Sequence, residues 1–273
     1  MQRVKLGVSY RSLCALLPAA LALIAIASPG RAQGIAERGR ELVTKRSDAV
    51  VTVKLAMKVR MSMEGREQEE ESTSEITATM IDPSGLAVCA LSEADPTSAI
   101  GHMMGEDSET KFQIDVTDTK VRLADGTELP AKIVLRDKDL DLAFIRVNQP
   151  PAKPLTAVDL AAAAPSDAME EVFVLNRMGE VGNRMPAILV DRIVGVIKKP
   201  RVMYVPGPVG QYSNLGCPVF TPEGKVVGII VNRFPPQGAG GGREERSPLS
   251  VVMPAADVAD IAKQAAPPKA GAK

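Results

Sequence analysis

The sequence predicts an all-β protein with a short helix near each end. From residue 49 to residue 62, apolar and polar side chains alternate with a period of two, as they do in a half-buried strand. Further along, β-branched runs are separated by turn sequences, of which 82–85 and 221–224 are the clearest. Helical signals are confined to 34–46 and to a segment that Pro254 opens and that runs to about residue 265.

The remaining strands are shorter and follow one another along most of the chain. An acidic stretch at 64–71 interrupts the first strand pair, and we interpret it as a solvated hairpin tip. A polar loop at 92–109 holds the only histidine, His102, and a glycine-rich loop covers 235–246. Strands are expected at 76–81, 86–91, 112–116, 120–123, 129–135, 171–175, 187–197, 219–220, 226–231 and 249–253.

Composition excludes several classes of function. Lys and Arg together number 33, as do Asp and Glu, so no charge excess indicates a nucleic-acid partner. The absence of Trp and the few other aromatic residues disfavour grooves that stack bases or sugars. One histidine and two cysteines beyond the N-terminal region cannot complete a zinc site without further ligands. We therefore predict no metal and no cofactor.

The N-terminus has the layout of a secretory signal peptide, which we place at residues 1–32. Basic residues precede an apolar run at 13–27, and small residues follow it. Cleavage after Ala27 and cleavage after Ala32 both fit this layout. A retained anchor is the alternative, but the run is short for a span of about 20 residues. We expect export to the periplasm or the extracellular space, with no stable membrane span after cleavage.

The segment around Leu215 resembles the nucleophile loop of trypsin-like serine proteases of the HtrA/Deg type. In that family a G-N-S-G-G-P loop precedes a strand, a turn and a V-x-G-I strand. Here the loop reads Ser-Asn-Leu-Gly-Cys-Pro at 213–218, and the hairpin at 219–231 follows it. The resemblance places Leu215 in the position of the serine nucleophile. A leucine has no nucleophilic atom.

The same resemblance assigns the other two triad positions. The segment at 85–92 matches G-x-I-V-T-N-x-H, with Ser92 in the histidine position. A serine cannot accept a proton near neutral pH as an imidazole does. The segment at 137–147 is similar to D-x-x-T-D-L-A-L-L-K-I, and Asp141 matches its aspartate. With no imidazole to orient, we expect Asp141 to be a remnant that forms local hydrogen bonds.

The resemblance implies a fold of two six-stranded antiparallel β-barrels of the chymotrypsin type. The first barrel is expected at 33–150 and the second, with the closing helix, at 151–266. The tail at 267–273 has little means of folding, and no residues remain for a PDZ domain. The implied function is that of a homologue without proteolytic activity that binds a protein or peptide ligand. The expected cleft residues are Ser213, Asn214, Leu215 and Gly216.

Other interpretations remain open at this stage. An active endopeptidase could use displaced groups, such as Ser213 or Cys217 together with His102, and the chain could also be a structural component of the cell envelope. The resemblance brings Cys89 and Cys217 together beneath the site, so we expect a disulfide there, with two buried free thiols as the alternative. The sequence does not fix the oligomeric state.

Overall fold

The structure is a computed structural model that describes residues 30–63, 66–97, 99–100, 111–208, 210, 214–235 and 247–265. Contacts divide the chain into two compact units, Met1–Glu37 and Arg38–Lys273. The boundary falls within helix α2 (Gly30–Arg46), which begins four residues before the expected helix. The predicted signal peptide at 1–32 lies outside the described residues, apart from the start of α2. Everything that follows concerns the second unit.

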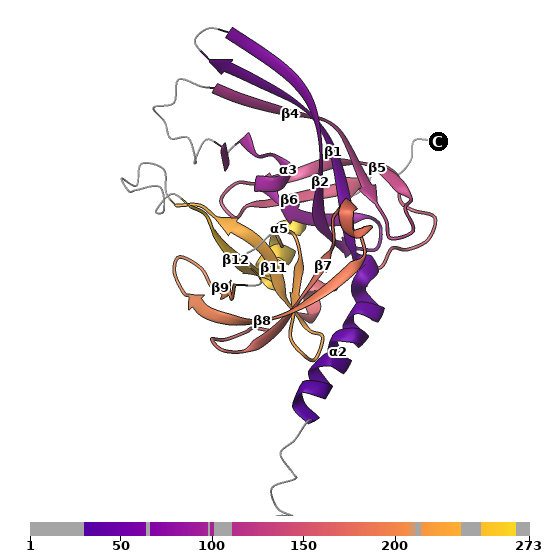
Figure 1. Cartoon of the computed structure of the whole chain (residues 1–273), viewed down its shortest axis with the longest axis vertical. Helices are drawn as coiled ribbons and strands as arrows, with labels where there is room; N and C mark the ends of the chain where they lie inside the picture. The colour runs from indigo at the N-terminus through magenta and orange to yellow at the C-terminus, as the bar shows by residue number, and fades with distance from the viewer. Residues whose placement is uncertain are drawn as a thin grey trace, which may run out of the picture. The chain divides into compact units, whose positions relative to one another are not determined.

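The strands close into two six-stranded antiparallel barrels, which confirms the predicted fold class (Figure 1). The first barrel has the order β1-β2-β3-β6-β5-β4 and the second the order β10-β11-β12-β9-β8-β7. The first contains β1 (Val50–Met63), β2 (Arg66–Asp82), β3 (Leu86–Ala90), β4 (Lys111–Arg122), β5 (Glu128–Asp137) and β6 (Leu142–Val147). The second contains β7 (Glu171–Arg177), β8 (Pro186–Ile197), β9 (Met203–Pro206), β10 (Pro218–Phe220), β11 (Val226–Arg233) and β12 (Leu249–Pro254).

Short helices complete the fold. They are α3 (Leu91–Ala94), α5 (Ala255–Ala262) and the 3₁₀ turns η3 (Ser47–Ala49), η4 (Leu160–Ala162) and η5 (Glu180–Gly182). Helix α5 buries Ala255, Val258 and Ile261, which are spaced by three residues and so share one face. This face packs against β11 and η4. Within the described part of the chain, no helix has the length and apolarity needed to cross a membrane.

Each barrel has its own apolar core. In the first barrel the alternation of β1 turns Val51, Val53 and Leu55 inward. There they pack with side chains from all the remaining strands, β2 to β6. The core of the second barrel includes Val172, Val219 and Ile230. Burial of such side chains contributes about 1.5–3 kcal/mol each to stability. The apolar residues of the period-two patterns thus face the interiors of the two barrels.

The structure corrects the expected hairpin tip at 64–71. Strand β2 begins at Arg66, so the glutamates at 67 and 69–71 lie within a strand that pairs with β1. Glu69 forms ion pairs with Lys58 and Arg60 of β1, each at 3.0 Å. Cross-strand pairs of opposite charge stabilise a sheet, which explains why an acidic stretch forms a strand here.

Two further expectations of secondary structure were wrong. The strands expected at 112–116 and 120–123 are one strand, β4, whose register with β1 shifts at a bulge beside Ala56 and Met57. The bulge absorbs the residue that breaks the alternation. The polar loop expected from residue 92 begins instead with helix α3, and the remainder, including His102, lies outside the described residues.

A buried arginine ties the two barrels together. Arg177 of β7 is only 8% exposed. Its Nε donates a hydrogen bond to the Val50 carbonyl oxygen at 2.6 Å, and its terminal nitrogens donate to Ser47 and Arg184 carbonyl oxygens, both at 2.8 Å. Burial lowers the pKa of this guanidinium from its ordinary value. The side chain therefore fastens β7 to the beginning of the first barrel.

Candidate functional site

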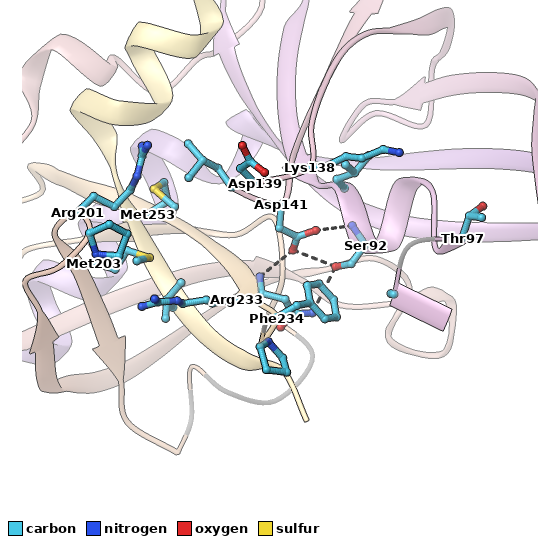
Figure 2. A pocket seen from close by; sticks show the side chains of 17 residues that line it. Ser92, Thr97, Lys138, Asp139, Asp141, Arg201, Met203, Arg233, Phe234 and Met253 are labelled. Atoms are coloured by element: carbon cyan, nitrogen blue, oxygen red, sulfur yellow. Dashed lines mark hydrogen bonds between the residues drawn. The ribbon is translucent and has the colours of Figure 1, made fainter. Parts of the chain in front are cut away.

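Asp141 is the centre of the site. It lies in the turn between β5 and β6, where its φ of 55° is one that aspartate tolerates better than most residues. Its Oδ1 accepts the Ser92 backbone N–H at 2.6 Å, and its Oδ2 accepts the Ser92 hydroxyl at 3.0 Å. The backbone N–H of Asn232 also donates to Oδ2, at 2.7 Å. The structure thus brings two of the predicted triad positions into direct contact (Figure 2).

The hydrogen-bond network crosses from the first barrel to the second. The Asn232 side-chain amide on β11 donates to Ser92 Oγ at 3.3 Å. The Ser250 hydroxyl on β12 in turn donates to Asn232 Oδ1 at 3.2 Å. Asp141 and Ser92 therefore do more than hydrogen-bond locally, because they join the helix α3 region to the ends of β11 and β12.

Two neighbouring carboxyl groups are held in a poorly solvated environment. Burial raises the pKa of Asp141 to about 6, against the opposing effect of the hydrogen bonds from Asn232 and Ser92. Burial, followed by the nearby charge of Asp141, raises the pKa of Glu93 to about 7. The Glu93 Oε2 atom is buried and has no hydrogen-bond partner in the described structure. Both groups consequently take up protons at a higher pH than a solvated carboxyl does.

The loop that resembles the nucleophile loop is a tightly anchored turn. The Cys217 N–H donates to the Asn214 carbonyl oxygen at 3.2 Å, and the Gly216 N–H donates to that of Ile230 at 2.8 Å. The Thr79 hydroxyl of the first barrel donates to the Gly216 carbonyl oxygen at 2.7 Å. Gly216 has a φ of 76°, and a Cβ there would collide with the Thr77 carbonyl oxygen. Only glycine fits this position.

A cleft of about 820 Å³ opens beside Asp141. Three kinds of side chain contribute to its walls. The second barrel supplies apolar residues, Met203, Val251 and Met253. The hydrogen-bonded residues Ser92, Asp141 and Asn232 lie between the barrels, and the cationic residues are Lys138, Arg201 and Arg233. Figure 2 shows the two arginines on one side of the Ser92–Asp141 pair and Lys138 on the other.

The expected cleft residues are not those that line this cleft. Asn214, Leu215 and Gly216 are absent from its walls, and Ser213 lies outside the described residues. Leu215 packs against the core of the second barrel instead. Asn214 is 4% exposed and accepts a hydrogen bond from the Asn176 side chain at 2.8 Å. Leu215 itself is partly buried by this contact.

The expected disulfide is not present, since Cys89 and Cys217 are both free thiols. Each lies in the core of its own barrel, and Cys89 Sγ is 3.7 Å from the Ala143 carbonyl oxygen. Both are fully buried, and burial raises the pKa of each thiol well above its ordinary value. A thiol in this state is a poor nucleophile, which disfavours Cys217 as a catalytic group. His102 and Ser213, the other displaced groups considered for catalysis, lie outside the described residues.

Comparison with known proteins assigns the fold to a family. The family model of the trypsin-like peptidase domain matches residues 77–229, which is more than half of the chain. The chain belongs to the trypsin-like peptidase family. The match includes all three positions that the sequence resemblance assigned to the triad, Ser92, Asp141 and Leu215.

One curated protein and one solved structure are similar to this trypsin-like peptidase domain. A curated relative from Bartonella henselae, described as a probable periplasmic serine endoprotease, DegP-like, is 28% identical over 153 residues. These residues are 55% of this chain and 29% of the relative, so the chain spans less than a third of the relative's length. The crystal structure of the apo MamO protease domain from Magnetospirillum magneticum has a TM-score of 0.50 at 13% identity. It covers 80% of this chain and 97% of that domain, and it supports the fold alone.

Several site residues of this trypsin-like domain escaped the sequence-based reasoning. Asn232 and Ser250 are single polar residues in apolar strands, which was the one available signal, but such residues also occur on outward faces. Glu93 carried no motif. Arg201 and Arg233 lie far from the triad segments in sequence, and only the closure of the second barrel brings them to the cleft.

Proposed function

We propose that this trypsin-like domain has no peptidase activity and that it binds an extended segment of another protein in the cleft beside Asp141. The observation that carries the proposal is the hydrogen bond from the Ser92 hydroxyl to Asp141. Acyl transfer requires a nucleophile and a base within hydrogen-bond reach. In the position of the general base this domain has Ser92, whose hydroxyl donates a hydrogen bond to the Asp141 carboxylate.

The second requirement of the chemistry is also unmet. Leu215 packs against the core of the second barrel and offers no nucleophile. Both oxygens of Asp141 already accept hydrogen bonds, so the carboxylate is occupied in holding Ser92 and Asn232 in place. The same arrangement supports binding, because it fixes the walls of the cleft without any substrate.

The end of β11 contributes to the cleft wall. Its last residues, up to Arg233, pair with β12, and Asn232 and Arg233 line the cleft. The main-chain groups on the other edge of β11 are already bonded, because the Gly216 N–H donates to the Ile230 carbonyl oxygen and the Asn232 N–H donates to Asp141. A ligand segment would therefore be held mainly by the side chains that line the cleft.

We further propose that the protein is exported to the periplasm or the extracellular space. The layout of residues 1–32 supports this proposal. The relative from Bartonella henselae is described as periplasmic, which agrees with it. Detection of the chain in the periplasmic fraction with residues 1–32 removed would support export, and an intact chain in the cytoplasm would contradict it.

Binding and turnover can be measured together on short labelled peptides of varied sequence. Fluorescence anisotropy should show saturable binding, and mass spectrometry should show the same peptides uncleaved afterwards. Ala99→Trp places an indole at the cleft wall and should weaken binding by about tenfold or more. Ala168→Trp, at an exposed position of the second barrel that does not line the cleft, is the matched control. Cleavage of the peptides, or equal binding by both variants, would contradict the proposal.

A further inference from the structure

Three cations at the cleft have no partner of opposite charge among the described residues. Lys138, Arg201 and Arg233 line the cleft, and none of them forms an ion pair or a side-chain hydrogen bond with another described residue. Of the two acidic residues on the walls, Asp141 already accepts three hydrogen bonds, and Asp139 forms no ion pair with a described residue. The cleft therefore has unneutralised positive charge.

Some arginines on the barrel surface have carboxylate partners. Arg184 donates two hydrogen bonds to the Glu75 carboxylate, at 2.7 and 2.9 Å. Arg60 pairs with Glu69 and with Asp115, each at 3.0 Å. Neither arginine of the cleft has such a partner among the described residues. Apolar walls strengthen the field of unpaired charges, because they hold little water to screen it.

Apolar side chains accompany these charges at the same end of the second barrel. Met203, Val251 and Met253 form a buried base of the wall, and Phe234 and Pro235 line the cleft and are partly exposed. Val202, beside Arg201, is 43% exposed, and Leu249, which pairs with Arg233 across the sheet, is 38% exposed. A ligand that carries only negative charge would leave these surfaces in water. A polypeptide with both acidic and apolar side chains would cover them.

The positions of the cations favour an extended ligand over a small anion. Figure 2 shows Arg201 and Arg233 on one side of the Ser92–Asp141 pair and Lys138 on the other, so the cations are spread along the cleft wall. From these observations we infer that the cleft selects extended polypeptide segments in which acidic and apolar side chains are interspersed. This inference rests on the proposed function and names its ligand class.

The test compares two labelled peptides by fluorescence anisotropy. In the first, Asp and Glu alternate with Val and Leu, and in the second, Asn and Gln replace the acids. At low ionic strength the acidic peptide should bind about tenfold more tightly, since it forms two or three ion pairs in a partly desolvated cleft. At about 1 M salt, where the Debye length is about 3 Å, this advantage should fall to about twofold.

Charge reversal locates the effect. Arg201→Glu combined with Arg233→Glu should abolish the preference for the acidic peptide over the neutral one. Arg192→Glu combined with Lys225→Glu makes the same change of net charge at two exposed positions that do not line the cleft, and it should retain the preference. Equal losses in the two variants would overturn the assignment to the cleft, because a long-range effect of net charge would then explain the result.

The remaining outcomes separate this inference from the proposed function. Equal affinity for the two peptides, with binding still sensitive to Ala99→Trp, would refute the acidic preference and leave peptide binding intact. No binding of either peptide would refute both. The chain has acidic residues of its own at 106, 107 and 109. If neutralising them by Glu106→Gln, Asp107→Asn and Glu109→Gln raises the affinity for the acidic peptide, the natural occupant is this segment and the inference of a separate partner is wrong.

Discussion

Glu93 should make this protein less stable as the pH rises through neutrality. Its Oε2 atom is buried without a hydrogen-bond partner, and Asp141 is a neighbouring source of negative charge. The folded protein therefore favours the protonated form of Glu93. Glu93→Gln replaces this group with a neutral side chain of nearly the same shape, so it should remove the dependence on pH.

The magnitude follows from the pKa of Glu93, which is raised from 4.5 to about 7. At 1.36 kcal/mol per unit, this difference corresponds to about 3 kcal/mol. The folded state binds this proton more tightly than the unfolded state, so the contribution of Glu93 to the free energy of unfolding is highest at low pH. It falls as the pH rises from about 4.5 to about 7 and then becomes constant. Between about pH 5 and about pH 8, wild type should lose about 2.5 kcal/mol relative to Glu93→Gln.

Urea unfolding of both proteins at the two pH values measures this difference directly. Any constant cost of burying an amide cancels in the comparison between pH values, so the result does not depend on how well glutamine packs. Glu71→Gln is the control, because the Glu71 side chain is 81% exposed, and it should change little between the two conditions. A Glu93→Gln protein whose stability relative to wild type is the same at both pH values would refute the reasoning.

Three further substitutions test the contacts that hold the site. Arg177→Met removes one buried and two partly buried hydrogen bonds to carbonyl oxygens and should lower the free energy of unfolding by about 3–5 kcal/mol, as measured in urea. A loss below about 1 kcal/mol would contradict the role of Arg177 between the barrels. Gly216→Ala should destabilise by more than about 3 kcal/mol because of its positive φ and the collision with Thr77, whereas Gly195→Ala, where a Cβ has open space, should be nearly neutral by thermal melting. Asp141→Asn replaces one carboxylate oxygen, which accepts hydrogen bonds from Ser92 or Asn232, with an amide NH₂ group that cannot accept them. This change should lower the free energy of unfolding by about 1–3 kcal/mol. An unchanged midpoint of unfolding would contradict the role of Asp141 in this network.

The fold was predictable because alternation and turn chemistry act locally. The pattern of β1 fixed which side chains enter the first barrel, and the turn before β3 requires Gly85, whose φ is 100°. Asp141 and Ser92 were identified from their places in two short motifs that resemble those of the family. The structure shows these two residues hydrogen-bonded to each other.

The rest of the site depends on contacts that no local pattern records. The cleft walls at Arg201 and Arg233 come from segments that meet only when the second barrel closes. Leu215 could be identified as a missing nucleophile, but its packing into the core, away from the cleft, is a tertiary effect. The acidic run at 67–71 looked like a loop because its cationic partners, Lys58 and Arg60, lie on another strand. Cys89 and Cys217 were expected to meet, whereas each side chain entered its own barrel core.

The most direct test of the central claim is the hydrolysis of unfolded casein by the purified domain, followed together with labelling by a fluorophosphonate probe and with trypsin as the positive control. The Ser92 hydroxyl donates a hydrogen bond to Asp141, and Leu215 has no nucleophilic atom. We therefore predict no labelling by the probe and no casein hydrolysis above the blank. Labelling of the native chain, or casein hydrolysis that Leu215→Ala does not change and the probe abolishes, would show that another serine is activated and would contradict the account.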